Sequence, residues 1–282
     1  MNKINEDRKI IQLALAEDLG KGDITTRALQ LNSKAGKAVV IAKAPGIISG
    51  IAAFIWVYKT ISPVLSFVIL KPNASSVVPG DEVLRIKGPL DAILTGERTA
   101  MNFLGHLSGV ATMTHDMVEA IKDYPAKILD TRKTMPGMRR LEKLAVRDGG
   151  GTNHRLGLFD MYLIKENHIA AAGGLENALK KVSAHRKRTK AKIEVEVKSF
   201  DELKLALTFN PDYILLDNFS LEMLDEGVRL ARAIDPAVIL EASGNVALET
   251  VKKIAAAGVD RISVGKITHS APVLDLSLKV AE

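Results

Sequence analysis

The stretch KIEVEVKSFDELKLALTFNPDYILLDN, Lys192 to Asn218, decides the fold class. It begins and ends with short runs rich in β-branched and apolar residues, the kind that form buried strands. Between them, residues 201–209 carry apolar side chains at helical spacing. A strand, a helix and a second strand in this order form a right-handed crossover, which makes the two strands parallel. The stretch therefore predicts an α/β fold built on a parallel sheet or barrel.

The same alternation extends over the second half of the chain. Helical periodicity recurs in residues 220–234 and 247–257, and Gly258 follows the second of these as an expected helix C-cap. Short apolar segments between the helices are predicted to be parallel strands. There are six of them: AKILDT, DMYLIK, KIEVEV, YILLDN, VILEAS and RISVGK.

The first part of the chain has a different pattern of predicted helices and strands. An amphipathic start is followed by the β-rich segments KAVVIAKAPGIISG, VLSFVIL and EVLRIKG, which Pro and Gly residues separate. Residues 88–124 are predicted to be mainly helical, with breaks at Gly105 and Gly109. This is an α+β pattern, so we place a domain boundary near residue 108.

Polar side chains stand at the carboxyl end of every predicted strand. Ligands bind at this end in barrels and in doubly wound sheets. Any strand that leaves the core can end in a polar residue, but six in succession with complementary chemistry favour a binding site. The residues are Asp130, Thr131, Arg132 and Lys133; Lys165, Glu166 and Asn167; Glu196; Asp217 and Asn218; Ser243, Gly244 and Asn245; Gly265 and Lys266.

The strand KIEVEVK carries an independent signal. Its alternation puts Glu194 and Glu196 on one face and the apolar Val195 on the other. If Val195 packs beneath the helices, both glutamates point into the barrel, where an unpaired charge costs several kcal/mol. Their partners are either lysines in an internal network, or a metal or a ligand rich in hydroxyl groups.

Glycine-containing turns follow the last two predicted strands. Ser243-Gly244-Asn245 and Val264-Gly265-Lys266 are placed where barrels often hold a phosphate on backbone N–H groups. A further Gly-rich segment, GGGTNHRLG (residues 149–157), favours a loop that wraps a ligand, with a flexible hinge as the alternative. The histidines form no metal-binding pair at helical spacing, so we expect no zinc site.

The composition excludes cysteine chemistry and argues against export and membrane insertion. The 282 residues include no cysteine, which excludes disulfides, thiolate metal sites and Cys nucleophiles. The charged N-terminus MNKINEDRKI lacks the apolar segment of a signal peptide. The longest uncharged run, residues 44–58, is too short to span a bilayer. We therefore expect a cytoplasmic protein that does not bind membranes.

The net charge of +6 attracts anions of any kind. Aromatic residues make up only 4% of the chain, and no basic stretch is interleaved with aromatic side chains for stacking on bases. The densest basic run, HRKRTKAK (residues 185–192), is expected to be a solvated connection between a helix and a strand. Small phosphates and carboxylates are therefore the expected partners, and nucleic acid is not.

One long segment resembles a known family signature. Residues 129–169, LDTRKTMPGMRRLEKLAVRDGGGTNHRLGLFDMYLIKENHI, look like quinolinate phosphoribosyltransferase, also called nicotinate-nucleotide pyrophosphorylase (carboxylating). ALAEDLGKGDITT, LTGERTAMNFLGHLSG, IEVEV, ILLDN, LEASGN and ISVGKITHSAP resemble the same family in the same order. The resemblance implies an N-terminal α/β sandwich domain (1–108), an incomplete α/β barrel of about six parallel strands (109–271) and a C-terminal segment (272–282) that returns to the first domain.

The resemblance also implies a reaction. Quinolinate and phosphoribosyl pyrophosphate (PRPP) would give nicotinate mononucleotide, carbon dioxide and pyrophosphate in NAD biosynthesis, with Mg²⁺ as cofactor. Arg98 would reach the quinolinate pocket from a neighbouring subunit. The resemblance therefore implies a homodimer with shared active sites, or a higher oligomer.

Residue roles follow from the matching motifs. The resemblance implies that quinolinate is bound by Arg98, Thr131, Arg132, Lys133, His154, Arg155 and Lys165. It implies that PRPP is bound by Glu196, Asp217, Ser243, Gly244, Asn245, Val264, Gly265 and Lys266, with magnesium at Glu196 and Asp217. The implied catalytic residues are Lys133, Lys165, Glu196 and Asp217.

Three other functions remain as alternatives at this point. A molybdenum-locus relative of the same fold would act on another anionic acceptor, but that branch departs at TRKT and LIKENH, which this chain keeps. A barrel lyase would use Lys165 to form a Schiff base. A basic nucleic-acid-binding protein would bind DNA with a steep salt dependence.

Overall fold

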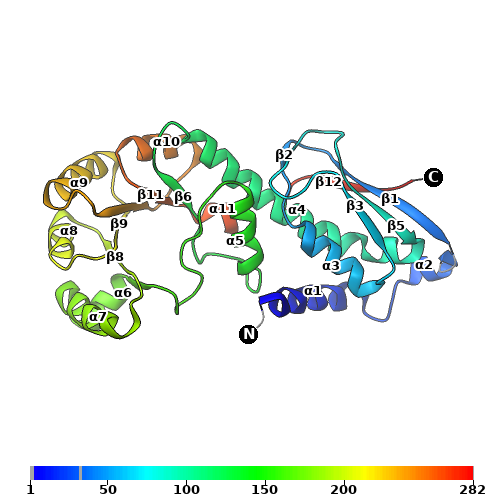
Figure 1. Cartoon of the computed structure of the whole chain (residues 1–282), viewed down its shortest axis with the longest axis horizontal. Helices are drawn as coiled ribbons and strands as arrows, with labels where there is room; N and C mark the ends of the chain where they lie inside the picture. Colours follow the sequence, from blue (N-terminus) through cyan, green and yellow to red (C-terminus); the bar gives the residue numbers. More distant parts are fainter. Residues whose placement is uncertain (1–2, 32–33, 282) are drawn as a thin grey trace. The chain divides into compact units, whose positions relative to one another are not determined.

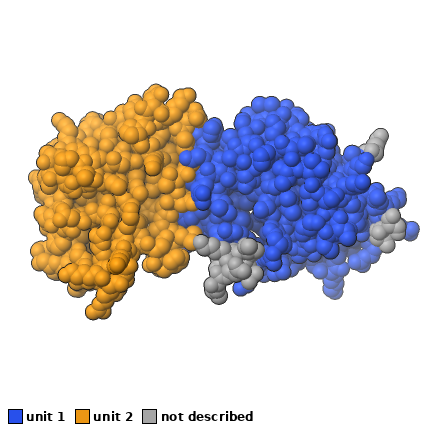
Figure 2. All heavy atoms as spheres, in the orientation of Figure 1, with its two compact units in different colours: residues 1–115, 134–150, 267–282 blue, residues 116–133, 151–266 orange. Residues whose placement is uncertain are grey.

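The structure is a computed structural model that describes residues 3–31 and 34–281 (Figure 1). The chain forms two compact units, which Figure 2 colours separately. Each unit is assembled from segments that are distant in the sequence. Unit 1 comprises residues 1–115, 134–150 and 267–282, and unit 2 comprises residues 116–133 and 151–266.

These units divide the chain differently from the expected domains. The expected boundary at residue 108 falls inside one continuous helix, α4 (Leu90–Ala120). Residues 134–150, which we expected in the barrel, group with unit 1 because their contacts lie there. At the end of the chain, β12 (Leu276–Ala281) pairs antiparallel with β1 (Ala35–Ala42), so this last strand is part of a unit 1 sheet.

Unit 1 is built on antiparallel strands. Four of them form a sheet in the order β12-β1-β5-β3, and β2 pairs with β4. Among the residues that the structure describes, every helix is too short or too polar to cross a bilayer. The remaining elements of this unit are α1 (Lys3–Leu19), α2 (Ile24–Ala28), β2 (Gly46–Ile47), α3 (Ile51–Ile61), β3 (Ser66–Ile69), β4 (Ser76–Val77), β5 (Glu82–Pro89), α5 (Arg139–Asp148) and α11 (Lys266–His269). The first residue of α11, Lys266, belongs to unit 2.

Helix α4 corrects one expectation. Gly105 and Gly109 were predicted to break this region, but the helix runs through both. Their role is close packing, since a Cβ on Gly109 would lie 2.0 Å from the carbonyl oxygen of Pro272. The carbonyl oxygen of Gly105 accepts a hydrogen bond from the Leu274 N–H at 3.0 Å. Glycine at both positions lets the C-terminal segment lie directly against the helix.

Unit 2 is an incomplete parallel barrel. Its strands follow the order β6-β11-β10-β9-β8-β7, and every pairing is parallel. β6 and β7 stand at the two ends of this order, so the sheet is open. All six predicted strands are confirmed: β6 (Lys127–Leu129), β7 (Tyr162–Ile164), β8 (Ile193–Val197), β9 (Tyr213–Asp217), β10 (Ile239–Ser243) and β11 (Arg261–Ser263).

Helices cover the outer side of the arc of strands (Figure 1). The Ser199 and Ser220 side chains cap α8 and α9 by accepting backbone N–H groups. Gly258, with φ of +89°, follows α10 where a C-cap glycine was expected. The run 185–192 was predicted to be a connection, but its first five residues form the end of α7. These helices are α6 (Glu166–Ala172), α7 (Leu175–Thr189), α8 (Phe200–Leu207), α9 (Leu221–Ile234) and α10 (Leu248–Ala256).

Candidate active site

The carboxyl ends of the barrel strands meet at one edge of the parallel sheet. There, Asp217 of β9 pairs with Ser243 of β10. Two residues before Asp217, Leu215 of β9 pairs with Glu196 of β8 on one side and with Glu241 of β10 on the other. Because side chains alternate along a strand and paired residues share a face, all of these side chains lie on one face of the sheet. Residues expected to bind ribose, magnesium and phosphate therefore share this face.

The glutamates of β8 point into the barrel, as the alternation predicts. Glu194 is fully buried and Glu196 is 8% exposed. Val195 and Val197, on the opposite face, are also fully buried, and α8 packs on this strand. The two carboxylates are therefore held away from bulk water, and each needs a compensating group.

For Glu196 the compensating group is Lys165. The Lys165 Nζ lies 3.0 Å from Oε2 of Glu196, and the lysine follows β7 directly at the start of α6. The lysine side chain is 48% exposed, whereas that of Glu196 is 9% exposed. The pair thus joins a residue expected to bind quinolinate to one expected to bind ribose, and it leaves the cation accessible to an anionic ligand.

Lys198 adds a second positive charge near these carboxylates. It forms an ion pair with Glu166, and this hydrogen bond raises the pKa of the Lys198 ammonium. The charges of Asp217 and Glu196 raise that pKa further. Asp217 accepts a hydrogen bond from the Asn218 side-chain amide at 2.9 Å. Lys198 was not among the predicted site residues.

Asp130 fixes the Gly-rich loop to the end of β6. Its carboxylate is fully buried and accepts hydrogen bonds from the His154 N–H at 2.8 Å and the Asn153 side-chain amide at 2.6 Å. Beside them, Thr152 forms a parallel bridge with Leu129. The part of the loop that carries the histidine and arginine is thereby held in place.

Arg132 and Arg155 bring two guanidinium groups into the same region. Burial lowers the pKa of Arg155, and the charge of Arg132 lowers it further, as expected for neighbouring cations. Arg155 donates a hydrogen bond to the Met161 carbonyl oxygen at 3.1 Å. Lys133 is exposed, and its N–H donates to the Thr131 hydroxyl at 3.0 Å. The local charge is therefore positive.

The turn after β10 contains two residues with positive φ angles, Gly244 and Asn245. Gly244 has φ of +105°, and a Cβ there would lie 2.1 Å from the side-chain oxygen of Asn218. Asn245 also has a positive φ, of +47°. After β11, the buried Val264 donates its N–H to Leu129 at 2.8 Å, and Gly265 and Lys266 follow it. Only glycine fits the first of these turns without moving its neighbour.

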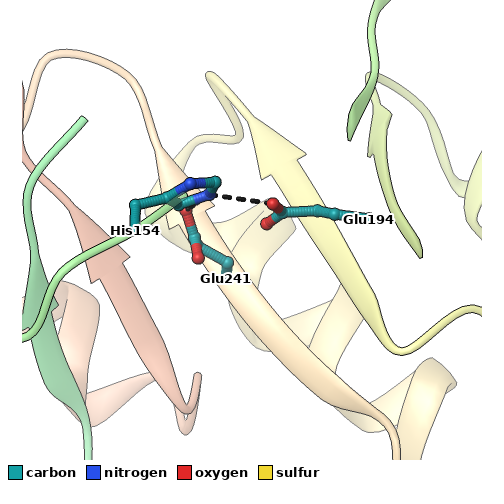
Figure 3. A group of neighbouring side chains, drawn as sticks. All are labelled: His154, Glu194 and Glu241. Carbon is teal, nitrogen blue, oxygen red and sulfur yellow. Dashed lines mark ion pairs between the residues drawn. The ribbon is translucent and has the colours of Figure 1, made fainter. Parts of the chain in front are cut away.

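A buried cluster of three ionisable side chains lies inside the barrel (Figure 3). His154 Nε2 lies 2.8 Å from Oε2 of Glu194 and 3.6 Å from Oε1 of Glu241. Burial raises the pKa of Glu241 to about 7, and the charge of Glu194 contributes. Ligand atoms of the three residues lie within 4.8 Å of one another. Glu241 was not predicted, although a glutamate inside the apolar strand VILEAS is the same signal that identified Glu194.

Arg98 belongs to unit 1. It lines a cavity of about 450 Å³ together with Met135, Met138 and His106. The buried Glu142 carboxylate holds this region by contacting His106 Nε2 at 2.8 Å and accepting the Met135 N–H at 3.2 Å. Arg98 is thus separated by unit from the other residues expected to bind quinolinate, all of which lie in unit 2: Thr131, Arg132, Lys133, His154, Arg155 and Lys165.

Two family models cover nearly all of the chain. The model described as the quinolinate phosphoribosyl transferase N-terminal domain matches residues 23–108. The model described as the C-terminal domain of the same enzyme matches residues 110–279.

Relatives of known name agree with these models. A probable nicotinate-nucleotide pyrophosphorylase [carboxylating] of Synechocystis is 40% identical over 96% of this chain and 91% of its own length. The nicotinate-nucleotide pyrophosphorylase [carboxylating] of Mycobacterium leprae is 40% identical over 96% of both chains. The solved structure of nicotinate-nucleotide pyrophosphorylase from Francisella tularensis has a TM-score of 0.90 and 41% identity, covering 98% of this chain and 96% of that one. The chain belongs to the quinolinate phosphoribosyltransferase family.

Proposed function

We propose that the polar ends of the barrel strands form the active site for phosphoribosyl transfer to quinolinate. The chain is an enzyme of this family, and its reaction converts quinolinate and PRPP into nicotinate mononucleotide, carbon dioxide and pyrophosphate in NAD biosynthesis. The observation that carries the proposal is the Lys165–Glu196 pair at 3.0 Å, which joins the expected quinolinate residues to the expected ribose residues in one unit.

Recognition of quinolinate rests on concentrated positive charge. Quinolinate is a dianion at neutral pH, and Arg132, Lys133, Arg155 and Lys165 supply four cations at the strand ends. A guanidinium group matches a carboxylate with two parallel hydrogen bonds, whereas an ammonium group offers a compact charge. Each charge-assisted hydrogen bond contributes about 1.5 to 3 kcal/mol. Guanidinium and ammonium groups together select a ring with two adjacent carboxylates. Thr131 is the remaining residue of unit 2 that is expected to bind quinolinate.

PRPP would occupy the neighbouring strand ends. Glu196 and Asp217 have the carboxylate oxygens that ribose hydroxyls require as acceptors. We infer that the turns after β10 and β11 bind the phosphate, although the Val264 N–H itself donates to the Leu129 carbonyl oxygen. Their residues are Ser243, Gly244, Asn245, Val264, Gly265 and Lys266, of which Lys266 contributes a charge.

Magnesium fits the same residues. Glu196 and Asp217 are oxygen ligands of the kind Mg²⁺ prefers, and they stand on adjacent strands. Two carboxylates with the oxygens of a substrate pyrophosphate are a usual magnesium environment. When bound, the ion would neutralise charge on the departing pyrophosphate.

The bond changes require few groups from the protein. The pyridine nitrogen forms a bond to the anomeric carbon while the bond from that carbon to pyrophosphate oxygen breaks. Positive charge develops on the ribose, and Glu196 or Asp217 stabilises it electrostatically. The alkylated ring nitrogen is then cationic, so the carboxylate on the adjacent ring carbon leaves as carbon dioxide. The electron pair of the broken C–C bond stays on that carbon, which takes up a proton from water. Lys133 and Lys165 hold the carboxylates during these steps.

Arg98 supports a shared site in a homodimer. It lies in unit 1, lines the 450 Å³ cavity and is the one cation of the expected quinolinate set outside unit 2. We infer that it serves the quinolinate pocket of a neighbouring subunit.

The substrates are highly charged metabolites that do not cross bilayers, which supports a cytoplasmic location and gives no role to nucleic acid or membranes.

An assay with purified protein tests the proposal. With quinolinate, PRPP and Mg²⁺ we expect nicotinate mononucleotide and pyrophosphate, identified by chromatography and mass. Nicotinate in place of quinolinate is the control and should give no nucleotide, because it lacks the carboxylate whose loss completes the reaction. Turnover of nicotinate at a rate similar to that of quinolinate would contradict the proposal.

A further inference from the structure

Two Lys–Glu pairs connect the end of β8 to the start of α6. Lys165 and Glu166 are consecutive residues at the point where β7 leads into α6. Glu196 lies near the end of β8, and Lys198 is the first residue after that strand. The Lys165 ammonium group contacts Glu196, and the Lys198 ammonium group contacts Glu166. Each segment therefore supplies one lysine and one glutamate to the other.

The two pairs differ in their exposure to solvent. The side chain of Glu196 is 9% exposed, so Lys165 compensates a buried charge. In the second pair, the side chain of Lys198 is 46% exposed and that of Glu166 is 69% exposed. Exposed ion pairs contribute little to stability because water already solvates both charges. Lys198 can therefore exchange Glu166 for another anion with little loss of stability.

Lys198 lies at the active-site edge of the parallel sheet. Residues two apart on a strand share a face, so Lys198 continues the inward face of Glu196. Val197 pairs with Leu216 of β9, and the next position along both strands places Lys198 beside Asp217. The lysine is thus next to the two carboxylates that are expected to bind ribose and magnesium.

The backbone of Lys198 is fixed, whereas its side chain can reorient. The Lys198 N–H donates a hydrogen bond to Oε2 of Glu202 at 2.7 Å. The Ser199 hydroxyl oxygen accepts the Glu202 N–H at 3.2 Å and caps α8. A lysine side chain is a flexible stem with a compact charge at its end. Lys198 therefore combines a rigid point of attachment with a mobile ammonium group.

We propose that Lys198 binds the pyrophosphate group of PRPP, and that Glu166 holds the lysine in place until this substrate is bound. The inference rests on the proposed function and adds to it a residue that binds the leaving group. In the complex, charge-assisted hydrogen bonds to phosphate oxygens replace the contact with Glu166. No covalent bond to the lysine forms or breaks, so it acts through its charge and position.

The order of the strands favours the pyrophosphate over the 5-phosphate of PRPP. The turns after β10 and β11 are the expected phosphate site, and the ribose residues stand on β9 and β8. Lys165, which is expected to bind quinolinate, follows β7, the next strand in the sheet. Pyrophosphate is attached to the anomeric carbon, the same carbon that the quinolinate nitrogen attacks. It therefore lies on the side of the ribose that faces β8 and β7, where Lys198 is placed.

The charges at this edge of the sheet require a cation of this kind. Pyrophosphate carries several negative charges, and the carboxylates of Glu196 and Asp217 would repel it. Lys165 is already assigned to Glu196 and to quinolinate, which leaves Lys198 as a further cation beside these carboxylates. A positive charge here also stabilises the negative charge that develops on the pyrophosphate as it departs.

Substitutions of the two members of the exposed pair separate substrate binding from a structural role. Lys198→Met removes the cation, so the KM for PRPP should rise at least about tenfold while that for quinolinate changes less than about twofold. Lys198→Arg keeps the charge and should raise the KM for PRPP less than about threefold. Glu166→Gln releases the lysine and should leave the KM for PRPP unchanged or lower it.

The matched controls are Lys180→Met and Glu176→Gln, which disrupt an exposed pair within α7 and should change neither KM. A contact that only joins α6 to β8 would be lost equally in Lys198→Met and Glu166→Gln. Equal rises of the KM for PRPP in these two variants would therefore overturn the inference. Wild-type turnover of quinolinate is measured first, because its absence would refute the proposed function. Wild-type turnover with an unchanged KM for PRPP in Lys198→Met would refute only the role of Lys198.

A measurement on the unmodified protein does not depend on the folding of any variant. Lysines are acetylated with an amine-reactive reagent, with and without inorganic pyrophosphate and Mg²⁺, and the labelled sites are quantified by mass spectrometry. We expect pyrophosphate to reduce the labelling of Lys198 and to leave that of the exposed Lys180 unchanged. Labelling of Lys198 that is the same with and without pyrophosphate would overturn the inference.

Discussion

The Lys165 ammonium nitrogen lies 3.0 Å from a carboxylate oxygen of Glu196, and the two residues come from the ends of neighbouring parallel strands. Neither residue is near the other in the sequence. The pair neutralises a carboxylate that is almost completely buried, and it leaves half of the lysine side chain accessible. A single contact thus stabilises the barrel and connects the expected sites for the two substrates.

Lys165→Met should reduce both stability and activity. It leaves Glu196 without its partner, so the free energy of unfolding should fall by about 1 to 2 kcal/mol. Activity should be lost because a quinolinate cation is missing. The double variant Lys165→Met/Glu196→Gln should recover most of the stability and none of the activity.

Denaturant unfolding measures the stability of these variants, and steady-state assays measure their activity. Lys180→Met, which removes the lysine of an exposed pair with Glu176, is the control. Wild-type stability of the single variant would contradict this account.

Asp130→Asn should loosen the loop that carries Arg155. One oxygen of the fully buried Asp130 becomes an N–H₂ group that faces another donor, either the His154 N–H or the Asn153 amide. We expect a loss of about 1 to 3 kcal/mol in stability and a raised quinolinate KM. Asp123→Asn, at an exposed position, is the matched control. Unfolding of Asp130→Asn at the same denaturant concentration as the control would contradict this role of Asp130.

Gly109→Ala tests the packing explanation for the glycines of α4. Alanine in a helix is favoured over glycine by about 1 kcal/mol, so the substitution would stabilise an exposed helix. At this position the new methyl group would lie 2.0 Å from the Pro272 carbonyl oxygen, which is backbone and cannot rotate away. We expect a lower melting temperature, corresponding to about 1 to 3 kcal/mol. Asp116→Ala in the same helix is the control, and a stabilised Gly109→Ala protein would refute the explanation.

Stability should depend on pH through Glu241. Burial and the charge of Glu194 raise its pKa from 4.5 to about 7 in the folded state. A group with a raised folded pKa stabilises the fold below its unfolded pKa and loses this contribution as the pH rises through the folded value. His154 and Arg261, which face the same carboxylate, oppose the shift.

Relative to Glu241→Gln, the wild-type protein should therefore lose unfolding free energy between about pH 4.5 and pH 7. Urea unfolding of both proteins across this range is the measurement. Parallel stability curves for the two proteins would show that the carboxyl group has an ordinary pKa.

Subunit mixing tests the shared site. Arg98→Ala and Lys165→Ala subunits should each be inactive alone, since each lacks one quinolinate cation. A mixture refolded together should recover part of the activity, because some hybrid dimers contain one complete site. No recovery in mixtures whose hybrid dimers are detected by mass would contradict a site shared between subunits.

The six barrel strands were predictable because buried parallel strands are short, apolar and separated by helices of regular period. The inward direction of Glu194 and Glu196 was predictable from alternation along β8. In these cases the signal is local: it is contained within the residues that form the element.

Other features depend on partners that are distant in the sequence. Gly109 looks like a helix break until Pro272 is seen against it. Asp130 fixes a loop 24 residues later, and Glu241 lies beside His154 and Glu194. No spacing rule connects these residues, since tertiary packing alone brings them together.

Isotope-labelled quinolinate shows whether this protein couples phosphoribosyl transfer to loss of a carboxyl group. The carboxyl group next to the ring nitrogen is labelled with ¹³C, and the purified protein is supplied with PRPP and Mg²⁺. We expect equal amounts of labelled carbon dioxide, pyrophosphate and unlabelled nicotinate mononucleotide. Label retained in the nucleotide, or pyrophosphate released without carbon dioxide, would contradict it.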